Sequence, residues 1–245
     1  MNKKLKKITL VISTIAIIFA FTGCGSSKNT SSSKENEVKA EINENKKEKE
    51  YSKELAAFFP KEDMSEMQYS GTSEYSEAVK IGKVSGTKET LIIDLKGTVK
   101  RVAEEGEGAT GDKLQFVKEY TIDNESVKEV QTNGEIKKNQ GAIEKSTILK
   151  LPLEKGNKWE DEVELKGKTY KAETTIQDIS KGEDGKRIIT TETIVKGVEG
   201  YPDKTYREIK AFKEGKGLVE FSNVLVFEDG STMDFSYSLF EAGNE

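Results

Sequence analysis

The side chains available for catalysis in this chain are few in kind. Its 245 residues include no histidine and a single cysteine, Cys24. These counts exclude the Ser-His-Asp and Cys-His triads, zinc sites rich in histidine or cysteine, and any disulfide within the chain. The chemistry that remains open rests on carboxylates, because 44 residues are Asp or Glu.

Carboxylates could serve a glycoside hydrolase or a calcium site. A glycosidase needs two carboxyl groups about 5 to 9 Å apart in a cleft that binds sugar. No spacing singles out such a pair in Glu104-Glu105 or Glu160-Asp161-Glu162. Asp123-Asn124-Glu125 and Glu183-Asp184-Gly185 lack the spaced oxygen ligands of a calcium loop, so we interpret both as turns. The sequence therefore predicts no metal site, no cofactor and no catalytic residue.

Two further features could bind a ligand. Gly106-Glu107-Gly108 and Gly215-Lys216-Gly217 superficially resemble phosphate-binding loops, but neither is followed by Lys-Ser or Lys-Thr and a helix. Trp159, the only tryptophan, could be a platform on which a ligand stacks. Because Trp159 begins an alternating apolar strand, we prefer to interpret it as a core residue.

The first residues of the chain have the pattern of an export signal. Four lysines at positions 3, 4, 6 and 7 precede an apolar run from Ile8 to Phe21. As a helix this run would rise about 21 Å, short of the roughly 30 Å hydrocarbon core of a bilayer. The pattern therefore favours a signal peptide over a permanent spanning helix.

The segment Phe21-Thr22-Gly23-Cys24 resembles the lipobox of bacterial lipoproteins, although that family usually has leucine where this chain has Phe21. The resemblance implies that residues 1–23 are removed by cleavage between Gly23 and Cys24. It also implies that Cys24 becomes a lipidated N-terminus carrying acyl chains such as palmitate. Two or more acyl chains, at about 0.8 kcal/mol per buried methylene, would hold the product on the extracytoplasmic face of the cell membrane.

Residues 24–50 are expected to form a flexible tether behind the lipid. After Cys24 they are mostly Ser, Asn, Lys and Glu, with six lysines balanced by six glutamates. Such a segment buries too little apolar surface to offset its chain entropy. A short helix across Glu48 to Phe58 would place Leu55, Phe58 and Phe59 on one face.

The region beyond the tether is acidic. Removing the ten lysines and six glutamates of residues 1–50 from the totals of 39 bases and 44 acids leaves 29 and 38, a net charge of −9 for residues 51–245. An acidic domain without a basic aromatic patch is repelled by phosphate backbones, so nucleic acid is not an expected partner. A surface that faces cationic ligands, or that only keeps the protein soluble, fits this charge better.

Residues 51–245 are predicted to be an all-β, mainly antiparallel ectodomain. Apolar residues alternate along several runs, and Asn133-Gly134, Asp184-Gly185 and Asp229-Gly230 are typical of tight hairpin turns. The predicted inward positions in these runs are Leu91, Ile93, Leu95, Val99, Leu114, Phe116, Tyr120, Ile122, Trp159, Val163, Leu165, Tyr170, Ala172, Thr174, Ile176, Met233, Phe235, Tyr237 and Leu239. The same reasoning predicts burial of Ile188, Val219 and Phe221.

Self-comparison predicts an internal duplication into units 56–140 and 146–240. The matches keep their order, pairing Met67 with Trp159, Tyr75 with Tyr170, Ile93 with Ile189 and Phe116 with Tyr206. The alternative is chance, since β-rich sequences of similar composition align easily. As two related units, the halves would form a sandwich, a curved sheet or a half-barrel.

The segment 152–159, PLEKGNKW, resembles a Pro-Leu-x-x-Gly-x-x-Trp motif of uncharacterised secreted or lipid-anchored β-rich proteins of monoderm bacteria. The resemblance implies no activity. In the first unit the glycine and tryptophan positions are Met64 and Met67, so that copy departs from the motif. Physically, Pro152 would start a turn, Gly156 would allow a left-handed residue and Trp159 would enter the next strand.

Together these features predict a membrane-anchored lipoprotein of the cell surface that is not an enzyme. Its ectodomain would be a binding or scaffold module, with an envelope protein, a glycan or a lipid as the possible ligand. Two alternatives stay open. One is a half-barrel that carries a lipid in an apolar cavity, and the other is a surface hydrolase that uses paired carboxylates.

Overall fold

The computed structural model describes residues 49–61, 66–100, 114–133 and 141–240. All of them belong to one compact unit, Lys46–Glu245. Cys24, the lipobox and most of the tether lie outside the described residues, as do Gly134 and the segments that contain Glu104-Glu105 and Gly106-Glu107-Gly108. No helix within the described ranges is long and apolar enough to cross a membrane.

The described unit is built almost entirely from strands, which confirms the all-β prediction. Those of the first half are β1 (Met67–Gly71), β2 (Ser76–Gly86), β3 (Leu91–Lys100), β4 (Gln115–Ile122), β5 (Ser126–Asn133) and β6 (Lys145–Lys150). Those of the second half are β7 (Lys158–Leu165), β8 (Lys168–Lys181), β9 (Arg187–Lys196), β10 (Thr205–Lys213), β11 (Gly217–Val226) and β12 (Thr232–Leu239). The helical pieces are α1 (Lys53–Ala56), η1 (Thr72–Glu74) and η4 (Pro202–Lys204).

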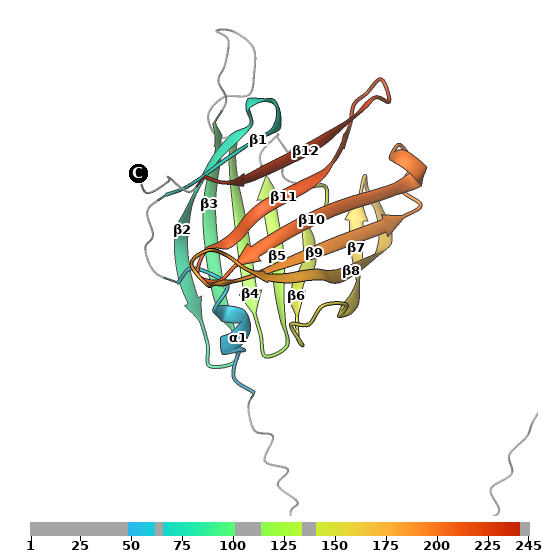
Figure 1. Ribbon diagram of the computed structural model, residues 1–245. Helices are drawn as coiled ribbons and strands as arrows, with labels where there is room; N and C mark the ends of the chain where they lie inside the picture. Colours follow the sequence, from blue (N-terminus) through green and yellow to red (C-terminus); the bar gives the residue numbers. More distant parts are fainter. Residues whose placement is uncertain (1–48, 62–65, 101–113, 134–140, 241–245) are drawn as a thin grey trace, which may run out of the picture. The chain divides into compact units, whose positions relative to one another are not determined.

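These strands form one antiparallel sheet of twelve in the order β6-β5-β4-β3-β2-β1-β12-β11-β10-β9-β8-β7. Each half is a meander in which consecutive strands pair, and the halves join where β1 pairs with β12. Figure 1 shows β8 to β12 crossing in front of β3 to β6, because the sheet rolls up on itself. The result is a barrel that is nearly closed, with β6 and β7 as its two free edges.

The alternation read from the sequence gives the inward face of β3, β4, β7, β8 and β12. Ile93, Phe116, Phe235 and Tyr237 are buried, as predicted. The turns predicted at Asp184-Gly185 and Asp229-Gly230 link β8 to β9 and β11 to β12. A turn follows Pro152 and Gly156 has a φ of +88°, so this segment also forms as expected ahead of β7.

Seven positions predicted to face inward or to be buried are only partly buried: Leu91, Leu114, Tyr170, Ile188, Val219, Met233 and Leu239. Ile188 belongs to the outward set of β9, since its neighbour Ile189 faces the core. Val219 fails for a different reason. The pairing of β10 with β11 passes from Ala211–Glu220 to Phe212–Leu218, so Val219 is the extra residue of a β-bulge. The extra residue of a bulge shifts the alternation of inward and outward side chains by one position, so a prediction based on strict alternation fails beyond it.

The helix α1 closes the end of the barrel next to the β2–β3 and β4–β5 hairpins (Figure 1). This helix is shorter than the one expected across Glu48 to Phe58, because residues 49–52 and 57–59 are not helical. Leu55 and the following Phe58 and Phe59 are nevertheless buried in the interior. The Phe59 ring lies 4.7 Å from that of Tyr120. The segment Gly215-Lys216-Gly217 has a structural role here, because its two glycine N–H groups donate to carbonyls of residues 57 and 58.

The predicted duplication is compatible with the order of the strands. Met67 and Trp159 lie in β1 and β7, and Ile93 and Ile189 lie in β3 and β9, so the matched residues fall on the corresponding strands of the two meanders. The pairing of β2 with β3 has an irregularity between residues 81 and 83, and that of β8 with β9 has one between 176 and 178. The duplication itself stays a prediction.

Candidate functional site

The interior of the barrel contains a cluster of buried charges. Lys210 on β10 faces inward and its Nζ lies 2.8 Å from Oε1 of Glu129 and 3.1 Å from Oε1 of Glu208. All three residues are at most 6% exposed. A charge buried in this way must be paired, because the cost of removing it from water is several kcal/mol. Lys118 on β4 is also buried and adds a second positive charge near Glu129.

The pKa shifts in this cluster follow from its charges. Burial alone would raise the pKa of Glu129, but Lys210 and Lys118 outweigh it and hold that pKa below its usual value. Burial opposes the charged form of Lys210 as well, yet Glu129 and Glu208 raise its pKa above the ordinary value for lysine. Glu129 and Lys210 are therefore both ionised at neutral pH.

A chain of hydrogen bonds runs from this cluster to the surface. The hydroxyl of Tyr206 donates to Oε2 of Glu208 at 2.6 Å and accepts the backbone N–H of Ala142 at 3.0 Å. Gly141 precedes Ala142 with a φ of +99°, and a Cβ at this position would lie 3.3 Å from Oε2 of Glu208. Glycine thus lets the backbone of the 141–142 segment approach the buried carboxylate closely.

The rest of the interior is filled by aromatic rings. Tyr237 is in contact with Tyr69, Tyr75 and Phe221, with ring centroids 5.1 to 5.9 Å apart. The Tyr69 hydroxyl donates to the carbonyl of residue 218 at 2.8 Å. These rings occupy the space between the sheet walls where a carrier would hold the chain of a lipid.

The free edges β6 and β7 are joined by side chains instead of a backbone ladder. The indole N–H of Trp159 donates to the carbonyl of Thr147 at 2.9 Å. The carboxylate of Asp161 accepts the N–H of Thr147 at 2.9 Å and its hydroxyl at 3.0 Å. Trp159 is 5% exposed, so the structure places this candidate ligand platform in the core, where it helps to close the barrel.

A surface pocket of about 400 Å³ lies near one end of this seam, and we call it the seam pocket. Its walls come from the segment before β6, the β7–β8 turn, the loop before β10 and the end of β11. The lining residues are Gly141, Ala142, Glu144, Glu164, Lys166, Gly167, Tyr201, Asn223, Val224, Leu225 and Val226. The volume is in the range of sites that bind small molecules.

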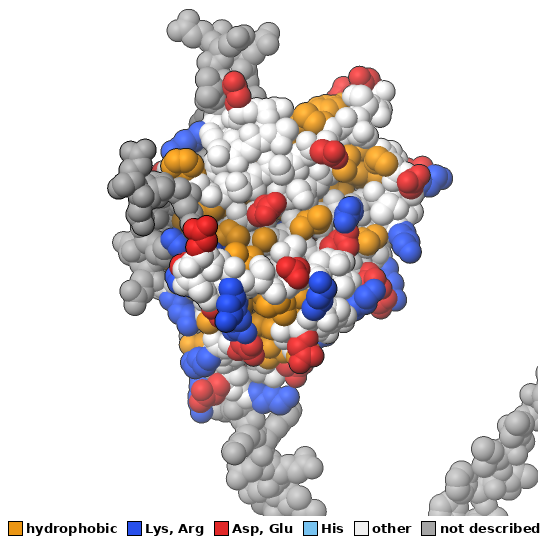
Figure 2. Space-filling view, in the orientation of Figure 1, with side chains coloured by type: hydrophobic (Ala, Val, Ile, Leu, Met, Phe, Trp, Pro, Cys, Tyr) orange, Lys and Arg blue, Asp and Glu red, His pale blue; other side chains and the backbone are white. Residues whose placement is uncertain are grey.

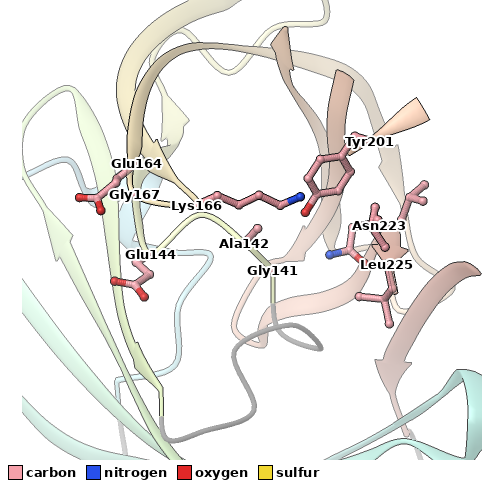
Figure 3. Close-up of a pocket in the computed structure, with 11 residues that line it drawn as sticks. Gly141, Ala142, Glu144, Glu164, Lys166, Gly167, Tyr201, Asn223 and Leu225 are labelled. Carbon is pink, nitrogen blue, oxygen red and sulfur yellow. The ribbon is translucent and has the colours of Figure 1, made fainter. Parts of the chain in front are cut away.

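Figure 3 shows how the polar side chains of the seam pocket lie. Glu144 and Glu164 are on one wall, and Tyr201 and Asn223 are on the opposite one. Lys166 extends from the β7–β8 turn toward Tyr201. Its Nζ lies 4.8 Å from the centre of the Tyr201 ring and donates to the carbonyl of Glu199 at 3.1 Å. The Lys166 ammonium is thus bound at the rim by groups of the protein.

Asn223 is the most unusual residue of the seam pocket. Its side chain points into the pocket (Figure 3), yet the residue is only 7% exposed. Its Oδ1 atom is buried and has no hydrogen-bond partner. A side-chain hydrogen bond connects Asn223 to Tyr206. A buried amide oxygen without a partner costs about 1 to 3 kcal/mol, which makes it a candidate for contact with a ligand or water.

The two acidic segments interpreted as turns, around Asp123 and Asp184, have structural roles. Asp123 lies in the β4–β5 turn, where its Oδ1 accepts the N–H groups of Glu125 and Ser126. Asp184 caps the β8–β9 turn by accepting the N–H of Lys186. Within the described ranges, no group of three or more Cys, Asp or Glu residues could hold a metal ion.

Sequence reasoning missed both the charge cluster and the seam pocket. One signal was present, since Tyr206, Glu208 and Lys210 alternate along one strand on the same face as the apolar Phe212. Polar residues in a predicted inward row indicate a buried network. The pocket left no comparable signal, because it combines residues from four separate segments.

No family model matches the chain, and no curated protein matches it. One similar solved structure is from Bacteroides fragilis and is described provisionally as an exported protein with a YmcC-like fold. It has a TM-score of 0.43 and 8% identity, and the match covers 74% of this chain and 96% of that one. A second, described provisionally as a lipoprotein of Parabacteroides distasonis, has a TM-score of 0.42, 10% identity and the same coverage.

Proposed function

We propose that this chain is a lipoprotein anchored through Cys24 on the extracytoplasmic face of the cell membrane, and that its barrel is a binding module without catalytic activity. The ligand would enter the seam pocket. The observation that carries the binding role is Asn223, whose buried Oδ1 has no partner although its side chain lines a pocket.

The anchor is supported by the sequence alone. A basic segment, a short apolar run and a small residue before the only cysteine occur in the order of a lipoprotein leader. The polar residues 25–50 that follow would hold the barrel away from the bilayer surface.

A binding module fits the barrel better than a lipid carrier does. A carrier needs an apolar cavity of the size of its ligand. Here the rings of Tyr69, Tyr75, Phe221 and Tyr237 pack against one another inside the barrel, and the charges of Lys210 and its partners are buried as well. Ionised groups in the interior would also repel an acyl chain.

The hydrolase alternative has weaker support. The seam pocket does contain two carboxylates beside an aromatic ring. However, Glu144 and Glu164 lie on the same wall of the pocket (Figure 3), whereas a glycosidase places its two carboxylates on opposite sides of the scissile bond. Loss of sugar release from a labelled glycan in Glu164→Gln would favour the hydrolase over the binding module.

A partner bound through charge alone is not favoured. Figure 2 shows basic side chains interspersed with acidic ones over the face formed by β8 to β12. A mixed surface keeps a protein soluble without creating the single-sign field that attracts a polyanion.

Lipid attachment is tested by growing cells with a labelled fatty acid. The wild-type chain is expected to take up the label and to enter the detergent phase, and Cys24→Ser is expected to lose both properties. Ser26→Ala is the matched control and should behave like the wild type. Labelling of Cys24→Ser would contradict the anchor.

The binding role is tested by native mass spectrometry of the full chain released from membranes in detergent. A binding module is expected to carry a small polar molecule or to be empty. A retained lipid that survives delipidation in mild detergent would instead identify a carrier.

A further inference from the structure

We infer that the seam pocket binds a ligand with a primary ammonium group. This inference rests on the proposed binding role and names the chemical class of the ligand. The ammonium group could belong to a free amine, an amino sugar or the side chain of a lysine in a peptide, and the test below distinguishes these sources.

Glu164 gives the pocket a hydrogen-bond acceptor with negative charge. Glu164 forms no ion pair with any lysine or arginine in the described part of the chain. Glu144 adds a second carboxylate to the same wall. The one lysine of the lining, Lys166, has its ammonium bound to the Glu199 carbonyl and the Tyr201 ring. Acceptors with negative charge favour a ligand that donates hydrogen bonds and is positively charged.

Asn223 adds an independent observation on the opposite wall. The Tyr206 hydroxyl already has the Ala142 N–H as a donor and Glu208 as an acceptor, so its bond to Asn223 is not needed to satisfy it. Rotation of the amide about its last torsion, which is soft, would exchange the places of Oδ1 and Nδ2 and so bring Oδ1 to the side of the pocket. An ammonium group there would give that oxygen the partner it lacks.

The remainder of the lining suits a short apolar body. Ala142 and residues 224–226 contribute aliphatic side chains beside Asn223. The net charge of −9 over residues 51–245 does not oppose the approach of a cation. The pocket thus pairs a polar, negatively charged wall with an apolar one.

Calorimetric titration of the full chain in detergent tests the inference with matched pairs of probes. Cadaverine is compared with pentanediol, which has the same length and no charge, and glucosamine is compared with glucose. Nα-acetyl-lysine amide represents a peptide side chain. We expect at least one amine to bind while its neutral counterpart does not, and the strongest amine identifies the source.

Two variants locate the binding. Glu164→Gln should weaken the binding of the strongest amine by about tenfold, the factor for one lost hydrogen bond to a charged group. Glu162→Gln, an exposed position on the same strand, is the control and should bind like the wild type. Asn223→Leu should weaken binding as well, with its fold checked by circular dichroism.

Each remaining outcome overturns the inference. Equal binding of amine and neutral probe, or binding that Glu164→Gln leaves unchanged, would mean that the pocket does not recognise an ammonium group. If glucose binds and Asn223→Leu abolishes that binding, the ammonium inference fails and the proposed binding role survives. If no probe binds, the inference fails, and the binding role is then judged by native mass spectrometry alone.

Discussion

Lys210 on β10 pairs with Glu129 on β5 across the interior of the barrel, with 2.8 Å between Nζ and Oε1. The two residues are 81 positions apart in the sequence and belong to different meanders. The pair therefore connects opposite walls of the rolled sheet. Because burial leaves water no access to either charge, each depends on the other.

The first prediction concerns this pair. Lys210→Met removes the only cation bonded to Glu129 and Glu208 in the described residues and should lower the free energy of unfolding by about 3 to 5 kcal/mol. Urea unfolding of the full chain in detergent, followed by tryptophan fluorescence, measures the change. The exposed Lys196→Met is the control. Adding Glu129→Gln and Glu208→Gln to Lys210→Met should recover part of the loss. A triple variant no more stable than Lys210→Met would show that lost packing, and not an unpaired buried charge, causes the destabilisation.

Alkaline pH should destabilise the barrel. Burial raises the pKa of Tyr120, Tyr206 and Tyr237 well above the ordinary value of 10.0. Above pH 10.0 these tyrosines lose their hydroxyl protons in the unfolded chain, whereas they keep them in the folded chain. The stabilisation is thus complete below about pH 10 and is lost as the pH rises further. Lys210 acts in the same direction because its pKa is also raised. A urea midpoint that stays constant from pH 9 to about pH 11 would contradict this account.

Acid should act through Glu129. Its pKa lies below the ordinary value of 4.5, so the unfolded chain takes up a proton before the folded chain does. The stabilisation is complete above about pH 5 and is lost as the pH falls through the folded-state pKa. The urea midpoint of the wild type should therefore fall at acid pH. Glu129→Gln should make this fall smaller, whereas the exposed Glu162→Gln should leave it unchanged. An equal fall of the urea midpoint in wild type and Glu129→Gln would mean that other carboxylates cause the loss of stability in acid.

Gly97 on β3 should not tolerate a side chain. An added Cβ would lie 2.0 Å from the ring of Phe116 on the neighbouring strand. Gly97→Ala should therefore cost about 1 to 3 kcal/mol, typical of overpacking. Thermal unfolding provides the measurement, with the exposed neighbour Thr98→Ala as control. Phe116→Leu combined with Gly97→Ala should be less destabilised than the sum of the single changes, and strict additivity would argue against the clash.

The seam between β6 and β7 should open when the indole N–H is removed. Trp159→Phe leaves the carbonyl of Thr147 without its donor, at a cost of about 1 to 3 kcal/mol. Hydrogen exchange followed by mass spectrometry should then become faster in peptides covering residues 145–150. Peptides from β2 and β3, which pair along their whole length, serve as the internal control. Equal acceleration in both regions would indicate global loosening.

The sequence was sufficient to predict the antiparallel strands, because side chains in a half-buried strand alternate with a period of two. Trp159, Val163 and Leu165 all face the core as that period requires. The same rule failed at Val219, where a bulge adds one residue to β11. Nothing in the local sequence marks that insertion, since it depends on the pairing of two strands.

The charge cluster and the seam pocket depend on contacts that are distant in sequence. Glu208 could be suspected from its inward position between Tyr206 and Lys210, but its relation to Glu129 appears only when the sheet closes. Asn223 looks like an ordinary polar residue in a strand, and its unpartnered oxygen follows from three-dimensional packing. Tertiary contacts of this kind are not encoded in a periodic pattern.

The most direct test of the central claim, that the seam pocket is a ligand site, is the amide NMR spectrum of the full chain in detergent during titration with cadaverine. The account predicts shifts at Gly141, Ala142, Gly167 and the side-chain amide of Asn223, which all line the pocket. Signals of Lys80 and Lys96, on the outer face of β2 and β3, should stay in place. Shifts confined to the outer face, or no shift in the pocket at saturating amine, would contradict the account.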